Sequence, residues 1–438
     1  MEKHDYQELG ESLFEETLPN GLFVQLLPKA GFHKTYALLT TDFGSTDRTF
    51  VPRGETEAIT IPDGVAHFLE HKMFEKADHD AFDLFGEYGA DANAFTSFTR
   101  TSYLFSASRH LTENLNVLLD FVQDPYFTPA TVEKEKGIIG QEIQMYDDDP
   151  SWQLFMGIVG NLYPTEPVHI DIAGTKESIS KITAEQLQQS YATFYHPSNM
   201  NLFVVGAFDP ATVMEIIRKN QAEKTFSAPE IIDRTIIENH DETEILPYRS
   251  RHLDVTMPKS IVGLRGLDDV PTGRAGLTYS LAASLLLDML FADTSTAYLK
   301  LYDDGIIDDS FDYDFSLERG FHFLTISSDT KAPSEFSEAM IDVLEHVDEY
   351  VTGEAADANF ELVKREAIGH HVMMLNSVEA IANAYEGKLF DNANLLDETK
   401  VLEAMTLTDI QSVAKSLIRS DGISVFDIMP VDDGNEPS

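Results

Sequence analysis

The segment His67-Phe68-Leu69-Glu70-His71 constrains the fold more than any other part of the chain. Positions i, i+3 and i+4 of an α-helix share one face, so His67, Glu70 and His71 would point into one small volume. The apolar residues between and after them predict a helix that is largely buried. Buried polar side chains need hydrogen-bond partners or a metal ion. The segment therefore predicts a buried helix with a metal-binding face.

Two imidazoles suit a borderline-soft divalent ion such as Zn²⁺. The order H-x-x-E-H is typical of one class of metallopeptidases, in which the Glu takes a proton from metal-bound water. The alternative is a pair of hydrogen-bonded histidines on a half-buried helix face. Asp63, which precedes Gly64 and an apolar run, is the expected N-cap of this helix.

A second helix is predicted over residues 131–143, and it carries two more acidic side chains. Glu135 and Glu142 are seven positions apart, which is two helical turns, so both carboxylates lie on one face. Glu142 can supply the third protein ligand that zinc requires. The alternative is a solvated helix face on which the acids pair with Lys134 and Lys136.

The two motifs together resemble those of the pitrilysin/insulinase metallopeptidases, in which H-x-x-E-H is followed about seventy residues later by a Glu on a second helix. The resemblance implies that His67, His71 and Glu142 are zinc ligands, with one Zn²⁺ per chain, and that Glu70 is the general base. Glu135 matches a supporting acidic residue, which we group with Glu70 in the catalytic apparatus but place behind the ligands.

The resemblance covers nearly the whole chain. The loop 51–63, with AHFLEHKMFE and VEKEKGIIGQEI, is most similar to a YmfH-type bacterial subgroup. Asn93, Ala94 and Phe95 match a strand that lies at the sheet edge beside the metal in this family. An exposed edge can bind an extended peptide by β-augmentation, so these three residues are candidate substrate contacts. The alternative is an ordinary amphipathic strand, and core packing is the expected role of Phe95 and Tyr103.

The fold implied is α+β, with two homologous domains that are each an antiparallel-rich β-sheet covered by α-helices. We expect a catalytic zinc-binding domain over residues 1–226, a linker over 227–249 that is rich in charge, and a metal-free domain over 250–438. Local patterns agree with the first domain: strands are predicted at 21–27 and 35–41, and an amphipathic helix at 111–121.

An internal repeat supports this division. The helix around 284–291 aligns with residues 67–74, and it places Ser284, Leu287 and Asp288 where the first half has its two His and Glu. The metal site therefore has no second copy. His370-His371 is not expected to form another, because adjacent helical residues point about 100° apart and no partner motif is nearby.

The composition excludes several classes of function. The formal net charge is −44, from 75 acidic and 31 basic residues. Such a field repels phosphate backbones and anionic lipids, so we expect neither nucleic-acid nor membrane partners. The chain has no cysteine, which excludes disulfides and thiolate ligands. With no apparent signal peptide or membrane-length apolar run, a cytoplasmic location is expected. The acidic charge would either attract cationic peptides or serve as a solvated surface.

The sequence thus predicts a zinc-dependent endopeptidase that hydrolyses peptides or short unfolded segments. The alternative is a non-catalytic core or chaperone-like subunit of a peptide-processing complex. Members of the family often place an Arg in the stretch that matches residues 298–310, and this stretch has none. We therefore expect a dimer with a related, possibly inactive subunit, or with a second copy of the chain. The acidic stretch could also be a solvated hairpin.

Overall fold

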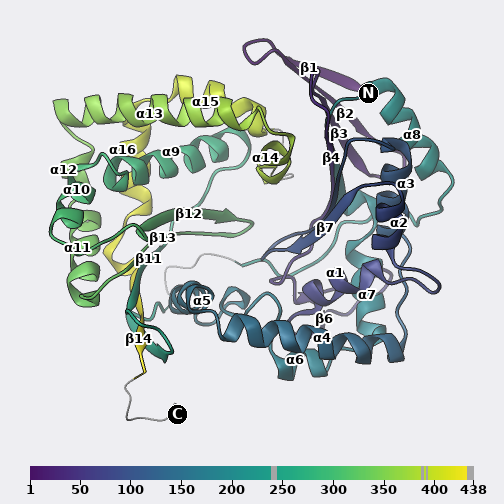
Figure 1. Ribbon diagram of the computed structural model, residues 1–438, viewed down its shortest axis with the longest axis horizontal. Helices are drawn as coiled ribbons and strands as arrows, with labels where there is room; N and C mark the ends of the chain where they lie inside the picture. The colour runs from purple at the N-terminus through teal and green to yellow at the C-terminus, as the bar shows by residue number, and fades with distance from the viewer. Residues whose placement is uncertain (238–243, 386–388, 391–392, 432–438) are drawn as a thin grey trace. The chain divides into compact units, whose positions relative to one another are not determined.

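The computed structural model describes residues 1–237, 244–385, 389–390 and 393–431. The chain forms two compact units, each assembled from several segments (Figure 1). Unit 1 contains Met1–Ile143, Asp171–Ile236 and Met374–Gly387, and unit 2 contains Gln144–Ile170, Ile237–Met373 and Lys388–Ser438.

Unit 1 is built on a seven-stranded sheet with the order β1-β2-β3-β9-β4-β8-β7. All neighbouring strands are antiparallel except β3 and β9, which run parallel. The strands are β1 (Glu2–Tyr6), β2 (Glu11–Thr17), β3 (Phe23–Pro28), β4 (Thr35–Thr41), β7 (Asp91–Thr96), β8 (Thr101–Ala107) and β9 (Met200–Gly206), with a separate pair β5 (Thr49–Phe50) and β6 (Ile59–Thr60). The central strands β4, β8 and β9 are buried along their whole length, so the core lies at the middle of the sheet.

Helices cover this sheet, and one of them positions the His67–His71 motif beside β7 and β8. The helices of unit 1 are α1 (Val65–Phe74), α2 (Ala81–Glu87), α3 (Leu111–Val122), α4 (Pro129–Asp147), α6 (Lys176–Ser180), α7 (Ala184–Phe194), α8 (Pro210–Ala222) and α14 (Val378–Asn383), with a 3₁₀ turn η2 (Pro197–Asn199). Helix α1 packs against β7 and β8, and α3 packs against β8 and β4. The last residues of α4, from Gln144, are grouped with unit 2.

Unit 2 repeats five of these strands in the order β10-β14-β11-β13-β12. Strand for strand, this order corresponds to β3-β9-β4-β8-β7, and the single parallel pair, β10 with β14, lies at the matching place. The strands are β10 (Tyr248–Leu253), β11 (Lys259–Arg265), β12 (Asp312–Glu318), β13 (Phe321–Asp329) and β14 (Ile423–Pro430). The predicted α+β fold with two homologous halves is confirmed.

The helices of unit 2, except α5 on the opposite face of the sheet, enclose a second core around the inward faces of β11, β13 and β14. They are α5 (Pro150–Leu162), α9 (Gly273–Phe291), α10 (Thr296–Asp303), α11 (Pro333–Glu345), α12 (Val347–Tyr350), α13 (Glu354–Met374), α15 (Glu398–Ala404) and α16 (Leu407–Leu417), with 3₁₀ turns η1 (Pro167–His169), η3 (Leu395–Asp397) and η4 (Ser420–Gly422). In the described part of the chain no single helix is long and apolar enough to cross a membrane; α9 and α10 meet that criterion only together, across a bend of 42°.

Each unit also holds a helix that comes from the other half of the sequence. Helix α5 packs on β14 and β11 of unit 2, where the side-chain amide of Asn161 donates to Val425 O at 2.9 Å. Helix α14 packs on β4 and β9 of unit 1, where the Tyr385 ring stacks on Phe203 with centroids 4.4 Å apart. Figure 1 shows α14 on one side of the unit 1 sheet and α3 and α8 on the other. The segments of the two compact units therefore alternate along the sequence, and the units do not coincide with the ranges 1–226 and 250–438.

The predicted linker, residues 227–249, is also partly structured. Arg234 forms an antiparallel bridge with Phe50, and its guanidinium donates to Asp42 O at 2.6 Å and pairs with Asp47 at 3.2 Å. The last residues of the range begin β10. Residues 238–243 lie outside the described part. The alternative considered for residues 298–310, a solvated acidic hairpin, is wrong, because the stretch forms α10 and the loop that leads to β12.

Candidate metal centre

Helix α1 carries the first motif as predicted, and every one of its residues except His71 is buried. The predicted N-cap is wrong, because the cap is Gly64, with φ 88°. A Cβ atom at Gly64 would lie 2.4 Å from Ala173 O, so both the backbone conformation and the space favour glycine. The Asp63 side chain pairs instead with Arg48 at 2.6 Å. The helix therefore begins against a fixed loop, which sets the position of the motif.

Helix α4 brings Glu142 to the two histidines of α1. The Nε2 atom of His67 lies 3.6 Å from Glu142 Oε1, and the Nε2 atom of His71 lies 3.3 Å from Glu142 Oε2. One ligand atom from each of the three residues lies within 4.8 Å of the others, the one such group of His, Asp and Glu among the described residues. Zinc bonds of 2.0–2.1 Å in a tetrahedron place neighbouring ligand atoms about 3.3 Å apart. The spacing and the chemistry of these donors fit a zinc-sized divalent ion.

Glu135 lies behind the group, on the side of His71 that faces away from Glu142. Its Oε1 atom is 3.2 Å from His71 Nδ1, and its side chain is buried. Burial opposes a charge on His71, but the carboxylates of Glu135 and Glu142 outweigh it and raise the pKa of His71 to about 10. Hydrogen bonds from His67 and His71 hold the pKa of Glu142 well below its usual range. Glu135 thus orients the ring, as carboxylates commonly do beside metal-binding histidines.

Glu70 shares the helix face with the histidines but makes a different contact. The Thr96 hydroxyl, at the end of β7, donates to Glu70 Oε2 at 2.5 Å. Burial raises the pKa of Glu70, while the positive charge of His67 acts in the opposite direction. Sequence reasoning missed the role of Thr96, since a strand threonine gives no sign of the helix it faces. Only the packing of β7 on α1 brings the two side chains together.

The candidate substrate contacts lie on β7, which is the last strand of its sheet. Asn93 is exposed, and Ala94 and Phe95 are half-buried. Within the described residues β7 pairs only with β8, so its other edge has no strand beside it. Peptide binding by these residues stays a prediction. Tyr103, by contrast, is fully buried, and its hydroxyl lies 2.7 Å from that of Tyr195, as the core role predicts.

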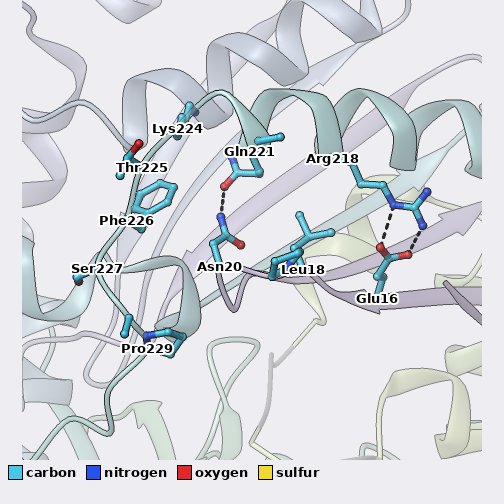
Figure 2. A pocket seen from close by; sticks show the side chains of 13 residues that line it. Glu16, Leu18, Asn20, Arg218, Gln221, Lys224, Thr225, Phe226, Ser227 and Pro229 are labelled. Carbon is cyan, nitrogen blue, oxygen red and sulfur yellow. Dashed lines mark hydrogen bonds and ion pairs between the residues drawn. The ribbon is translucent and has the colours of Figure 1, made fainter.

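A cavity of about 680 Å³ lies elsewhere in unit 1, between the turn from β2 to β3 and the C-terminal end of α8 (Figure 2). It shares no lining residue with the metal-binding group. Its charged side chains already have partners: Arg218 binds Glu16 at 2.5 Å, and Lys224 binds Asp120 at 2.7 Å. The cavity therefore offers no unpaired charge to a ligand.

The equivalent positions in unit 2 have other contacts. Ser284 is exposed, and Leu287 is buried in the core. Asp288 accepts a hydrogen bond from the Tyr313 hydroxyl at 2.9 Å. Residues 360–371 follow the sequence pattern of residues 131–142, which sets His371 against Glu142. His371 is buried, with its Nδ1 atom 2.8 Å from Glu398.

Comparison with known proteins identifies the class of this fold and site. Residues 49–176 match the family model of insulinase (peptidase family M16), and residues 181–365 match that of the peptidase M16 inactive domain. The chain is 46% identical over 426 residues to a Bacillus subtilis (strain 168) protein described as "uncharacterized zinc protease YmfH". The aligned region covers 97% of this chain and 98% of that protein. The chain belongs to peptidase family M16, and the predicted likeness to the YmfH-type subgroup is confirmed.

Solved structures agree with this assignment. An M16-like peptidase from Alicyclobacillus acidocaldarius is 35% identical, with a TM-score of 0.90 over 96% of this chain and 99% of that one. A protease from Helicobacter pylori has a TM-score of 0.77 over 95% and 99% of the two chains, but at 18% identity it shows the fold alone.

Proposed function

We propose that the protein is a zinc-dependent endopeptidase. The observation that carries the proposal is the convergence of His67, His71 and Glu142, with Glu70 on the same helix face and fixed by Thr96. A protein that had lost catalysis would have no reason to keep both a metal-binding group and an oriented carboxylate beside it. Relatives whose names describe them as zinc proteases support the same function.

In this proposal His67, His71 and Glu142 hold one zinc ion per chain. A bound zinc ion supplies a Lewis acid that lowers the pKa of a coordinated water and polarises a carbonyl oxygen. Glu70 takes the proton of the attacking water and delivers it to the leaving amine. Glu135 keeps the His71 ring in its orientation, and Thr96 does the same for the Glu70 carboxylate.

The substrates we propose are peptides or short unfolded segments, bound along β7 at Asn93, Ala94 and Phe95. We further propose a cytoplasmic enzyme that acts as a dimer, with a related inactive subunit or a second copy. The absence of an Arg in residues 298–310 is the reason, because a partner would then supply the missing grip on the substrate.

The test is Glu70→Gln, measured by zinc content and by cleavage of a peptide library. The amide is nearly isosteric but cannot accept a proton, so zinc should stay while the rate falls about 10²-fold or more. Glu133→Gln is the matched control, because Glu133 is exposed on α4 and pairs only with Lys136 among the described residues. Its rate should equal that of the wild type.

Assays at several protein concentrations, with light scattering, test the dimer in the same series, since specific activity should rise as the subunits associate. A Glu70→Gln variant that cleaves at the wild-type rate would reject the mechanism. A wild-type protein that binds zinc but cleaves no peptide at any concentration would support the alternative, a non-catalytic subunit of a processing complex.

A further inference from the structure

The sheet of unit 2 ends on a strand with an open edge. Strand β10 pairs with β14 on one side, and no strand in the described part of the chain pairs with its other side. The side chains of its first five residues, 248–252, are all exposed. Such an edge presents unpaired backbone groups to any extended chain that approaches it.

The hydrogen bonds at its two ends show which residues face outward. Val425 N donates to Pro247 O at 3.0 Å, and Val431 N donates to Leu253 O at 3.1 Å. In a parallel pair, alternate residues of one strand bond to the other strand. The odd-numbered residues of β10 therefore face β14, and three even-numbered residues direct N–H and C=O to the open edge: Tyr248, Ser250 and His252.

The internal repeat shows what kind of chain fits there. In unit 1, strand β3 corresponds to β10: β3 runs parallel to β9, as β10 runs parallel to β14. Its outer edge is covered by β2, which runs antiparallel to it. Strand β2 has the sequence Glu-Ser-Leu-Phe-Glu-Glu-Thr, so three of its seven residues are acidic. Unit 2 has no such strand among its described residues.

The positive charge of β10 is complementary to that of an acidic strand. In a chain with 75 acidic and 31 basic residues, this short strand carries Arg249 and Arg251. Both guanidinium groups are held by neutral oxygens: Arg249 donates to Asn161 and to Gly157 O at 3.3 Å, and Arg251 donates to the side chain of Gln153. Neither forms an ion pair with a carboxylate of the described residues, so both charges are available to a ligand.

We propose that β10 binds an extended acidic segment of a partner protein by β-augmentation, antiparallel to β10 and in the place that β2 occupies in unit 1. The segment would bond to the backbone of Tyr248, Ser250 and His252, while its carboxylates would pair with Arg249 and Arg251. Two copies of β10 would instead bring like charges together across the new strand pair, which is unfavourable. The site is independent of the peptidase activity.

The test is binding of a fluorescein-labelled peptide with the sequence of residues 10–18, which includes β2, to the full chain by fluorescence anisotropy. Saturable binding is expected. Ser250→Pro should weaken it at least about tenfold, because it removes an outward N–H, yet proline is tolerated on an edge strand where that N–H bonds nothing within the sheet. Ser250→Ala, which keeps the N–H, should bind as the wild type does, with equal melting temperatures for all three proteins.

Arg251→Glu should weaken binding by a similar factor, and the same peptide with its three Glu replaced by Gln should bind the wild type as weakly. Absence of saturable binding, or equal binding by the Ser250→Pro and Ser250→Ala variants, would overturn the proposal. Light scattering tests whether a second copy of the chain covers β10 instead. A wild-type dimer that Ser250→Pro converts to a monomer would show this and would also overturn the proposal.

Discussion

Helices α1 and α9 occupy the same place in two copies of one fold, yet of the two only α1 carries candidate metal ligands. Where α1 has His67, Glu70 and His71, α9 has Ser284, Leu287 and Asp288. Both pack beside the last strand of a matching sheet, β7 or β12. The same backbone arrangement therefore occurs both with and without a candidate metal site. The identity of three side chains on the helix makes the difference.

In each copy a side chain of the edge strand donates to an acid on this helix, although at different positions, since Asp288 aligns with His71 and not with Glu70. In unit 1 the Thr96 hydroxyl on β7 donates to Glu70, and in unit 2 the Tyr313 hydroxyl on β12 donates to Asp288. Burial raises the pKa of both acceptors, Glu70 and Asp288. The edge strand satisfies an acid on the helix in both units, buried for Glu70 and half-buried for Asp288, although only Glu70 lies beside the candidate metal ligands. Matched substitutions in the two copies can separate the catalytic contribution from the structural one.

The largest difference should follow removal of the first ligand. His67→Ala should lower zinc content from about one per chain to nearly none, because it removes one of three protein ligands. Ser284→Ala changes the equivalent position of α9, where the side chain is exposed, and should leave zinc content unchanged. Metal analysis of the purified proteins after dialysis checks both. Equal zinc in the two variants would show that the metal binds elsewhere.

The sequence predicted the elements of the fold better than their assembly. The strands at 21–27 and 35–41 and the helix at 111–121 correspond to β3, β4 and α3, since each has a clear apolar period. The exchange of α5 and α14 was not predicted. A periodic pattern shows which face of a helix is apolar, but not which of two similar sheets will cover that face. The N-cap of α1 was missed because glycine at a positive φ replaced the expected side-chain cap.

The grouping of these His and Glu side chains was predictable because they lie at fixed helical spacings. His67 and His71 are one turn apart, and Glu135 and Glu142 are two turns apart, so each pair shares a face before any tertiary contact is known. Thr96 was not predictable in the same way. Its partner is 26 positions away in the sequence and on another element, and only the packed structure shows the contact.

The packing of α5 on the sheet of unit 2 can be tested by substitution of a glycine in that helix. A Cβ atom at Gly157 would lie 2.3 Å from the Phe426 ring on β14, so Gly157→Ala should lower the free energy of unfolding by about 1–3 kcal/mol. Gly369 is also in a helix, but nothing lies within 4 Å of the same atom. Gly369→Ala should therefore raise the free energy of unfolding by about 0.5–1 kcal/mol. Urea unfolding followed by circular dichroism measures both, and a stabilised Gly157→Ala variant would contradict the packing of α5 on β14.

The two hydroxyl groups should have far smaller effects than the loss of a metal ligand. Thr96→Val keeps the shape of the side chain but removes the donor to Glu70, so kcat should fall about tenfold, or about 1.4 kcal/mol, with zinc content unchanged. Thr96→Ser, which keeps the hydroxyl, should restore most of the rate. Tyr313→Phe removes the donor from the edge strand of unit 2 to Asp288 and should cost about 1 kcal/mol of stability without changing kcat. Steady-state kinetics and urea unfolding of the three variants test these expectations. If Thr96→Val lowers stability but leaves kcat unchanged, then the hydrogen bond from the edge strand is structural in both units. Thr96 would then have no part in positioning Glu70 for catalysis.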